Sequence, residues 1–169
     1  AEIGMRAAIT GHMVLSTLHT NDVISTPIRL LDMGVPRYMV ALSLQLVLAQ
    51  RLVRVICENC AEAHTPAPHE HEWLRYELGD TVDQRRYVKG RGCAHCGGTG
   101  YSGRTGVYEM LEMTNEIVEA LNADDTGIFV QAARKQMAGE TLRRDAVRLV
   151  VKGRTTVDAA MRISNQFDD

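Results

Sequence analysis

The apolar positions in the first third of the chain follow two alternating periods. Spacings of three and four residues, typical of amphipathic helices, alternate with short apolar or β-branched runs, typical of buried strands. The pattern predicts a helix over residues 1–9, a strand over 12–16, helices over 22–34 and 37–48, and a strand over 51–56. A core face of Met39, Leu42 and Leu46 is expected on the helix over 37–48. Helices that alternate with strands indicate an α/β fold.

The periodic pattern stops at residue 57 and resumes near residue 104. Between these points prolines, histidines and glycines replace the regular apolar spacing, which is typical of a segment organised around something other than a large core. Strand-like alternation over 104–111 then predicts a return to the main sheet. Further helices are expected over 116–121, 127–137, 141–152 and 155–165. A capping box of Thr155 with Asp158 is expected to open the last helix.

Four cysteines fall in this irregular segment, and the chain has no others. They form two C-x-x-C pairs, Cys57 with Cys60 and Cys93 with Cys96, a spacing that lets four thiolates converge on one tetrahedral zinc ion. Four sulfur ligands leave no open position, so the expected zinc is structural. Two disulfides or a redox-active pair remain alternatives. The nearby histidines are spare candidate ligands that we expect to be solvated: His64, His69, His71 and His95.

Composition narrows the classes of function. The formal net charge of -2 combines 19 basic with 21 acidic residues, which gives no electrostatic case for a nucleic-acid partner. No run approaches the roughly 18 apolar residues that a membrane-spanning helix needs. Residues 98–103 satisfy the G-x-G-x-x-G pattern, but they follow a cysteine pair and precede no helix, so a dinucleotide site is not predicted.

Several motifs occur in an order that resembles one family. The first is Ala8-Ile9-Thr10-Gly11-His12-Met13-Val14-Leu15-Ser16-Thr17-Leu18-His19-Thr20-Asn21-Asp22. It is followed by Arg29-Leu30-Leu31-Asp32-Met33-Gly34-Val35, by Leu48-Ala49-Gln50-Arg51-Leu52-Val53-Arg54, by the four cysteines, and by Gly103-Arg104-Thr105-Gly106-Val107-Tyr108-Glu109. The chain resembles the C-terminal part of secretion ATPases that drive type II secretion and type IV pilus assembly. The cysteines are similar to those of assembly ATPases rather than retraction motors, and the branch serving mannose-sensitive haemagglutinin pili is the nearest resemblance.

The resemblance implies the fold of a RecA-like P-loop ATPase core, with an inserted tetracysteine zinc subdomain and a C-terminal helical region. The implied parts are 1–56 for the end of the core with its His box, 57–102 for the zinc subdomain, 103–113 for the return strand and 114–169 for the helices. In the family, the His-box histidine, here His19, senses the terminal phosphate of ATP, and Thr20 is expected beside the nucleotide. A histidine in a loop after a strand can donate to a phosphate oxygen.

The same resemblance implies an ATP- and Mg²⁺-dependent homo-hexamer in the bacterial cytoplasm, peripheral to the inner membrane. Its implied partner is an inner-membrane platform protein. Its ATP hydrolysis is expected to drive the extraction of pilin-like subunits. Phosphate binding in such enzymes requires G-x-x-x-x-G-K-[ST], yet no Gly-Lys pair occurs here. We therefore expect a C-terminal fragment that lacks Walker A and Walker B and is inactive alone.

Two other classes of function remain to be compared. A non-catalytic zinc-ribbon interaction module would explain the cysteines and the missing P-loop, but not the His19 loop. A hydrolase that uses Ser16, His19 and Asp22 is disfavoured, because residues so close along a strand and a tight turn rarely align as nucleophile, base and orienting group.

Overall fold

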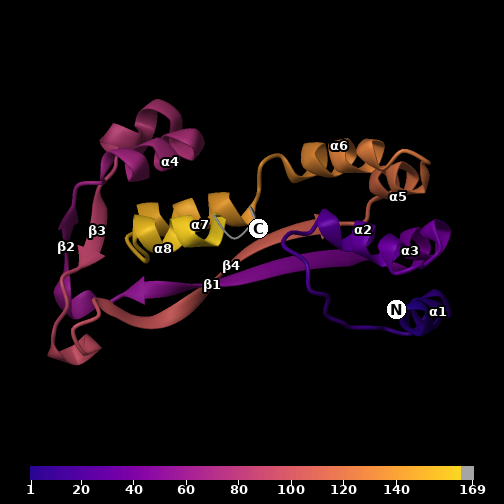
Figure 1. The fold of residues 1–169 in the computed structure, drawn as a ribbon, viewed down its shortest axis with the longest axis horizontal. Helices are drawn as coiled ribbons and strands as arrows, with labels where there is room; N and C mark the ends of the chain where they lie inside the picture. Colours follow the sequence, from indigo (N-terminus) through magenta and orange to yellow (C-terminus); the bar gives the residue numbers. More distant parts are fainter. Residues whose placement is uncertain (165–169) are drawn as a thin grey trace. The chain divides into compact units, whose positions relative to one another are not determined.

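A computed structural model describes residues 1–164 and separates them into two compact units (Figure 1). Unit 1 comprises residues 1–49 and 109–140, and unit 2 comprises residues 50–108 and, within the described part of the chain, 141–164. Two long strands, β1 (Leu46–Ile56) and β4 (Tyr101–Glu112), pair with each other and contribute residues to both units. Among residues 1–164, no helix has the length and apolar character needed to cross a membrane.

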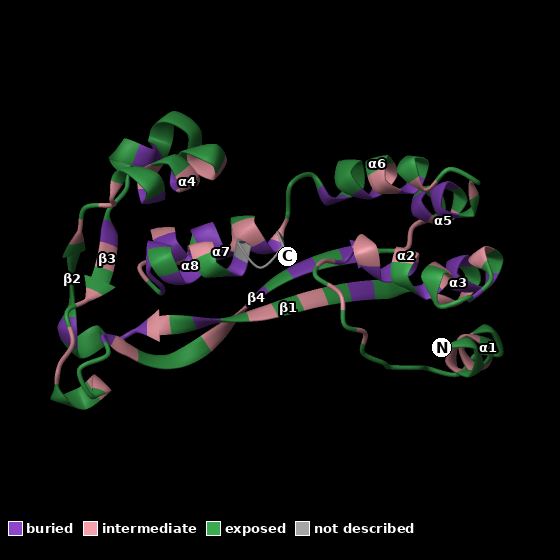
Figure 2. Ribbon diagram, in the orientation of Figure 1, coloured by how far each residue is buried: buried purple, intermediate pink, exposed green. Residues whose placement is uncertain are grey.

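Unit 1 is built on amphipathic helices that enclose an apolar core. Its helices are α1 (Glu2–Ile9), α2 (Ser25–Asp32), α3 (Arg37–Ser43), α5 (Asn115–Asn122) and α6 (Thr126–Met137). The centre of the core contains fully buried side chains from four elements, including Leu30, Val40, Leu111 and Phe129. Figure 2 shows buried positions alternating with exposed ones along α3 and α5, whereas α1 carries only intermediate and exposed positions. The helices predicted over 116–121 and 127–137 are confirmed as α5 and α6.

The strand predicted over 12–16 is wrong. Residues 12–20 adopt no regular secondary structure, and Met13 and Leu15 are each 90% exposed. The apolar run satisfies the composition of a strand. A strand, however, also needs neighbouring backbone to pair with, and no described segment pairs with this one.

The helix predicted over 37–48 ends early. α3 stops at Ser43, Leu44 is already extended, and the chain enters β1 at Leu46. The expected core face is corrected accordingly: Met39 is buried, whereas Leu42 and Leu46 are 60% and 49% exposed. The apolar residues that follow Ser43 fit either a helix or a strand. Periodicity over so few residues could therefore not show where the helix ends and the strand begins.

Unit 2 contains the irregular segment and the last two helices. Strand β2 (Ala61–His64) pairs antiparallel with β3 (Tyr87–Gly90), with Ala61 opposite Gly90 and His64 opposite Tyr87. Between these strands lie α4 (Pro68–Leu78) and the 3₁₀ helix η2 (Gly79–Gln84). The other elements of the unit are η1 (Glu58–Cys60), η3 (Ala94–Cys96), α7 (Leu142–Val151) and α8 (Val157–Ser164).

The helix α4 was not anticipated from the sequence, although its start carries recognisable signals. Pro68 occupies the first helical turn, where a missing N–H costs nothing, and the Glu70 carboxylate accepts a hydrogen bond from the Ala67 N–H at 2.8 Å. Arg143 of α7 holds the helix from the other side through an ion pair with Glu77 at 3.3 Å and a hydrogen bond to the Trp73 carbonyl at 2.8 Å.

The cap of the last helix lies one residue later than predicted, and the helix begins at Val157. Thr156, not Thr155, caps α8, because its hydroxyl accepts the Ala159 N–H at 3.1 Å. The Thr155 hydroxyl instead donates to the Arg54 carbonyl at 2.7 Å. Residue 165, the predicted end of this helix, lies outside the described residues. The helices expected within 114–169 are divided between the two compact units, α5 and α6 in unit 1 and α7 and α8 in unit 2.

Candidate metal centre

The four cysteines converge in unit 2. Their Sγ atoms all lie within 4.8 Å of one another, an arrangement that can hold a metal ion. Cys57 precedes η1 and Cys60 is its last residue, just after β1, whereas Cys93 precedes η3 and Cys96 is its last residue, before β4. Each pair occupies a tight knuckle, and the antiparallel β2–β3 pair brings the two knuckles together across the 32 residues that separate them in sequence.

The sulfur spacing suits a tetrahedral metal better than disulfides. The Sγ atoms are 3.9 Å apart between Cys57 and Cys93, 3.9 Å between Cys60 and Cys96, and 3.7 Å within the second knuckle. A disulfide requires about 2.05 Å. A tetrahedron with metal–sulfur bonds of about 2.3 Å has sulfur–sulfur edges of about 3.8 Å. The donor set and its dimensions therefore fit a four-sulfur metal site.

Glycines let the two chain segments approach closely around the cluster. Gly100 has φ of +77°, and a Cβ there would lie 2.4 Å from the Gly90 carbonyl oxygen. A Cβ on Gly92 would lie 2.5 Å from the Gly98 carbonyl oxygen. Of the three glycines in the pattern over 98–103, Gly100 is therefore the one that close backbone packing requires, since a Cβ at Gly98 or Gly103 meets nothing within 4 Å.

Burial and backbone N–H groups shift the pKa values of the thiols in opposite directions. Burial raises the pKa of Cys96, but hydrogen bonds from the N–H groups of Cys93 and Gly100, each at 3.2 Å, together with neighbouring thiols, lower it to about 6. Desolvation raises the pKa of Cys60 to about 12, and it also raises the pKa of Cys57. A bound cation would offset this desolvation cost by stabilising the thiolates directly.

The spare histidines do not join the cluster. His64 lies 3.1 Å from the Glu70 carboxylate and His71 lies 2.8 Å from the Asp83 carboxylate, so the expectation that both are solvated is wrong. His69 and His95 are exposed, and the grouping of metal-ligating side chains among residues 1–164 contains only the four cysteines. The cluster therefore contains the four side chains that the paired spacing indicated.

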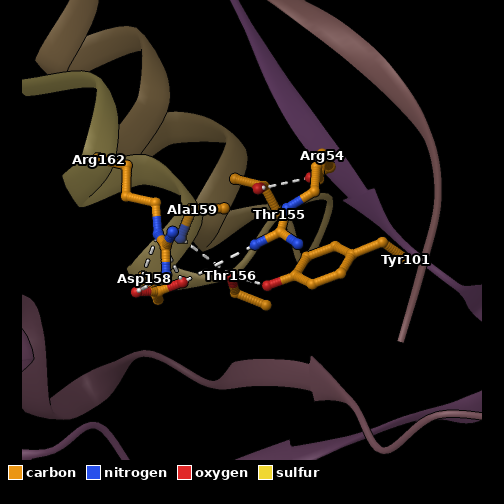
Figure 3. A network of polar contacts seen from close by, with 7 residues as sticks. All are labelled: Arg54, Tyr101, Thr155, Thr156, Asp158, Ala159 and Arg162. Atoms are coloured by element: carbon orange, nitrogen blue, oxygen red, sulfur yellow. Dashed lines mark hydrogen bonds and ion pairs between the residues drawn. The ribbon is translucent and has the colours of Figure 1, made fainter. Parts of the chain in front are cut away.

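The cluster is tied to the C-terminal helices through the strands that carry it. The Cys57 N–H donates to the Gly100 carbonyl at 2.9 Å, and the Ile56 N–H donates to the Arg154 carbonyl at 2.9 Å. The Tyr101 hydroxyl lies 2.8 Å from that of Thr156, the cap of α8 (Figure 3). These bonds link residues next to the cysteines with the loop between α7 and α8, a connection that short-range sequence patterns could not reveal.

The His19 loop belongs to unit 1 and has no regular secondary structure. His19 is exposed, and its ring makes no described hydrogen bond or ion pair. The Thr20 hydroxyl lies 2.8 Å from that of Thr26. The following turn is fixed by Asp22, whose carboxylate accepts the Ser25 N–H at 2.6 Å, and by Glu109, whose carboxylate accepts the Val23 N–H at 2.8 Å.

The fold and the cluster define a mixed α/β protein with four cysteines arranged to hold a metal ion. The family described as type II/IV secretion system protein matches residues 1–162, and the chain belongs to this family. The resemblance inferred from the motifs is thereby confirmed.

Individual relatives agree with the family match. A type IV pilus assembly ATPase PilB of Thermus thermophilus is 37% identical over 161 residues, which cover 95% of this chain and 18% of the relative. Type II secretion system protein E of Aeromonas hydrophila is 34% identical, and that of Pseudomonas aeruginosa is 36% identical. Each of these two matches covers 98% of this chain and 32% of the relative. The chain thus spans at most about a third of these relatives.

Proposed function

We propose that this chain is the C-terminal part of a RecA-like ATPase that powers type IV pilus assembly or type II secretion, with Zn²⁺ held by its four cysteines. The single observation that carries the proposal is the family match over residues 1–162, which spans both the His19 loop and the cysteine cluster. Relatives named pilus assembly ATPase and type II secretion protein E support both systems equally. The mannose-sensitive haemagglutinin branch remains our prediction within them.

The zinc in this proposal has a structural role. Four thiolates fill a tetrahedral site and leave no position for water or substrate, so the metal would hold Cys57, Cys60, Cys93 and Cys96 together without taking part in hydrolysis. The knuckles would then keep the ends of β1 and β4 in register, and with them the contacts to the α7–α8 loop.

The catalytic contribution that we assign to this chain comes from His19. The side chain is exposed in a loop whose end is fixed by Asp22 and Glu109. In the complete hexamer, its imidazole would donate to the terminal phosphate of Mg²⁺-bound ATP, with Thr20 beside the nucleotide. Such a contact strengthens as charge develops in the transition state, so it serves turnover more than affinity.

The complete protein would work in the bacterial cytoplasm, docked on an inner-membrane platform protein, and would extract pilin-like subunits from the membrane. The chain alone contains no Gly-Lys pair and hence no Walker A motif. We therefore expect it neither to bind nor to hydrolyse ATP appreciably. Magnesium-dependent binding at micromolar concentrations in a calorimetric titration would show that the nucleotide site is misplaced.

A chimera tests the proposal. In the Aeromonas hydrophila protein E, the matching 166-residue stretch is replaced by this chain, and the ATP hydrolysis rate is measured. We expect turnover to persist and His19→Ala to lower kcat by roughly 100-fold or more, with a small change in nucleotide affinity. His12→Ala is the matched control, because His12 is an exposed histidine of the same segment, bonded to Thr10 at 3.2 Å.

Two results would contradict the proposal. A folded chimera without activity would favour the alternative of a non-catalytic zinc-ribbon interaction module. Equal turnover for the His19 and His12 variants would remove His19 from the catalytic site. Thermal unfolding of each variant separates these outcomes from misfolding.

A further inference from the structure

Glu109 is an acidic residue at a position that suits an apolar one. It lies on strand β4, and its residue surface is only 6% exposed. Val107 and Leu111, two positions before and after it, are fully buried, so the three side chains share one face of the strand. Burying a carboxyl group costs free energy unless it is hydrogen-bonded. Apolar packing alone therefore does not explain a glutamate at this position.

The hydrogen bond to Val23 supplies a polar task for this carboxylate. The Val23 N–H donates to the Glu109 carboxylate at 2.8 Å, although 86 positions separate the two residues in sequence. Val23 is itself fully buried, and a buried N–H without an acceptor is costly. The bond therefore satisfies buried polar groups on both sides, and it attaches the backbone at Val23 to β4 within unit 1.

The attached backbone position lies close to His19 in the chain. His19 is exposed and follows a stretch without regular secondary structure, whereas Val23, a few residues later, is buried. Hydrogen bonds within residues 20–26 shape the turn between α2 and this stretch. The bond to Glu109 differs from them, because its acceptor belongs to a distant strand whose Leu111 is part of the core of unit 1. It therefore limits where the His19 imidazole can lie relative to that core.

We propose that Glu109 is a positioning residue for ATP hydrolysis and acts through His19. By holding the Val23 backbone, its carboxylate sets the place of the imidazole before nucleotide binds, so less order has to be gained in the transition state. Glu109 itself touches neither the nucleotide nor the reacting atoms. The inference rests on the proposed function, because it requires His19 to take part in hydrolysis.

The test is a double-mutant cycle in the chimera of the Aeromonas hydrophila protein E that carries this chain. Glu109→Leu removes the acceptor but keeps a side chain of similar size, and it should lower kcat roughly tenfold or more, with a change in KM below about threefold. In a His19→Ala background, the same substitution should change kcat by less than about twofold, because no imidazole is left to position. Glu109→Gln keeps an oxygen that can accept the Val23 N–H, and it should retain most of the turnover.

Controls separate positioning from a general loss of structure. Glu112→Leu is the matched control, since Glu112 is an exposed glutamate of the same strand, and it should leave kcat unchanged. Hydrogen exchange on the full chain gives a second readout: the Val23 amide should lose protection with Glu109→Leu and keep it with Glu109→Gln. If Glu109→Leu does not fold, Glu109→Asp replaces it in the cycle, because a shorter side chain keeps the carboxylate but withdraws it from Val23.

The possible failures are distinguishable. An equal loss of kcat with and without His19, a Glu109→Gln variant as impaired as Glu109→Leu, or unchanged protection at Val23 would overturn the inference and leave the proposed function in place. A folded chimera without activity, or unchanged turnover on His19→Ala, would contradict the proposed function itself, and the inference would fail with it.

Discussion

The apolar core of unit 1 and the cysteine knuckles of unit 2 are stabilised by different means. In unit 1, helices and strand ends bury a continuous group of side chains around Phe129, Leu30 and Leu111. In the knuckles, glycines and short turns replace bulky apolar residues, and Cys57, Cys60 and Gly100 supply the buried positions between residues 57–60 and 93–100. The first arrangement follows from burial of apolar surface. The second needs a ligand to offset the cost of ordering its backbone.

Metal removal should give the largest effect, because we expect it to lower amide protection in the knuckles but not in the apolar core of unit 1. Binding of structural zinc to small peptides is worth about 10–16 kcal/mol, and folding and metal binding are coupled in such sites. We expect a chelator to abolish amide protection at Cys57 and Gly100 and to lower it in the α7–α8 loop, which bonds to Ile56 and Tyr101. Hydrogen exchange with and without chelator measures this.

The control for metal removal lies within the same chain. Amides of α5 and α6 should keep their protection, because the buried side chains of these helices belong to an apolar core that contains no cysteine. Equal loss at Leu121 and Phe129 would contradict the distinction between the two regions.

Phe129→Ala tests the apolar region alone. Phe129 is fully buried, so its truncation should lower the free energy of unfolding of unit 1 by about 3–5 kcal/mol while the metal content stays unchanged. Ile128→Ala is a matched control on the same helix, because Ile128 is 49% exposed, and its cost should be within about 1 kcal/mol. Loss of metal from the Phe129 variant would show that the knuckles depend on this core.

A pair of glycine variants tests the knuckle backbone. Both glycines have positive φ, but a Cβ at Gly97 meets nothing within 4 Å, whereas a Cβ at Gly100 meets the Gly90 carbonyl oxygen. Gly100→Ala should weaken zinc affinity by roughly 10–100-fold, because it displaces an N–H that bonds to Cys96. Gly97→Ala should cost much less. Competition with a zinc-binding dye gives both affinities, and similar losses would contradict the close-approach explanation.

The smallest expected effect is a dependence of stability on pH that comes from Tyr87. Burial raises the pKa of its phenol, whose hydroxyl donates to the Val82 carbonyl at 2.9 Å. Because the neutral form is favoured by folding, its contribution to stability is present below pH 10 and is lost as the pH rises through the higher folded value. Absorbance at 295 nm should show a late step that Tyr87→Phe removes. A curve unchanged by this substitution would contradict the assignment.

Local patterns predicted much of this structure. Amphipathic spacing identified α5, α6 and α7, because one helical face carries the buried residues. The cysteine spacing identified the cluster, because only four such side chains exist and two turns present them.

Features that depend on distant neighbours could not be predicted. The run at 12–16 has the composition of a strand but no partner, and the residues after Ser43 could extend either a helix or a strand. The contact of Tyr101 with Thr156 joins residues 55 positions apart, and that of Thr155 with Arg54 joins residues 101 apart. No local pattern encodes such pairs.

The most direct test of the account is X-ray absorption at the zinc edge on the purified chain, combined with metal stoichiometry. We predict one zinc per chain surrounded by four sulfur atoms at about 2.3 Å, supplied by Cys57, Cys60, Cys93 and Cys96. A shell containing nitrogen or oxygen, or a chain that carries two disulfides and no zinc, would contradict a knuckle organised by a four-sulfur metal.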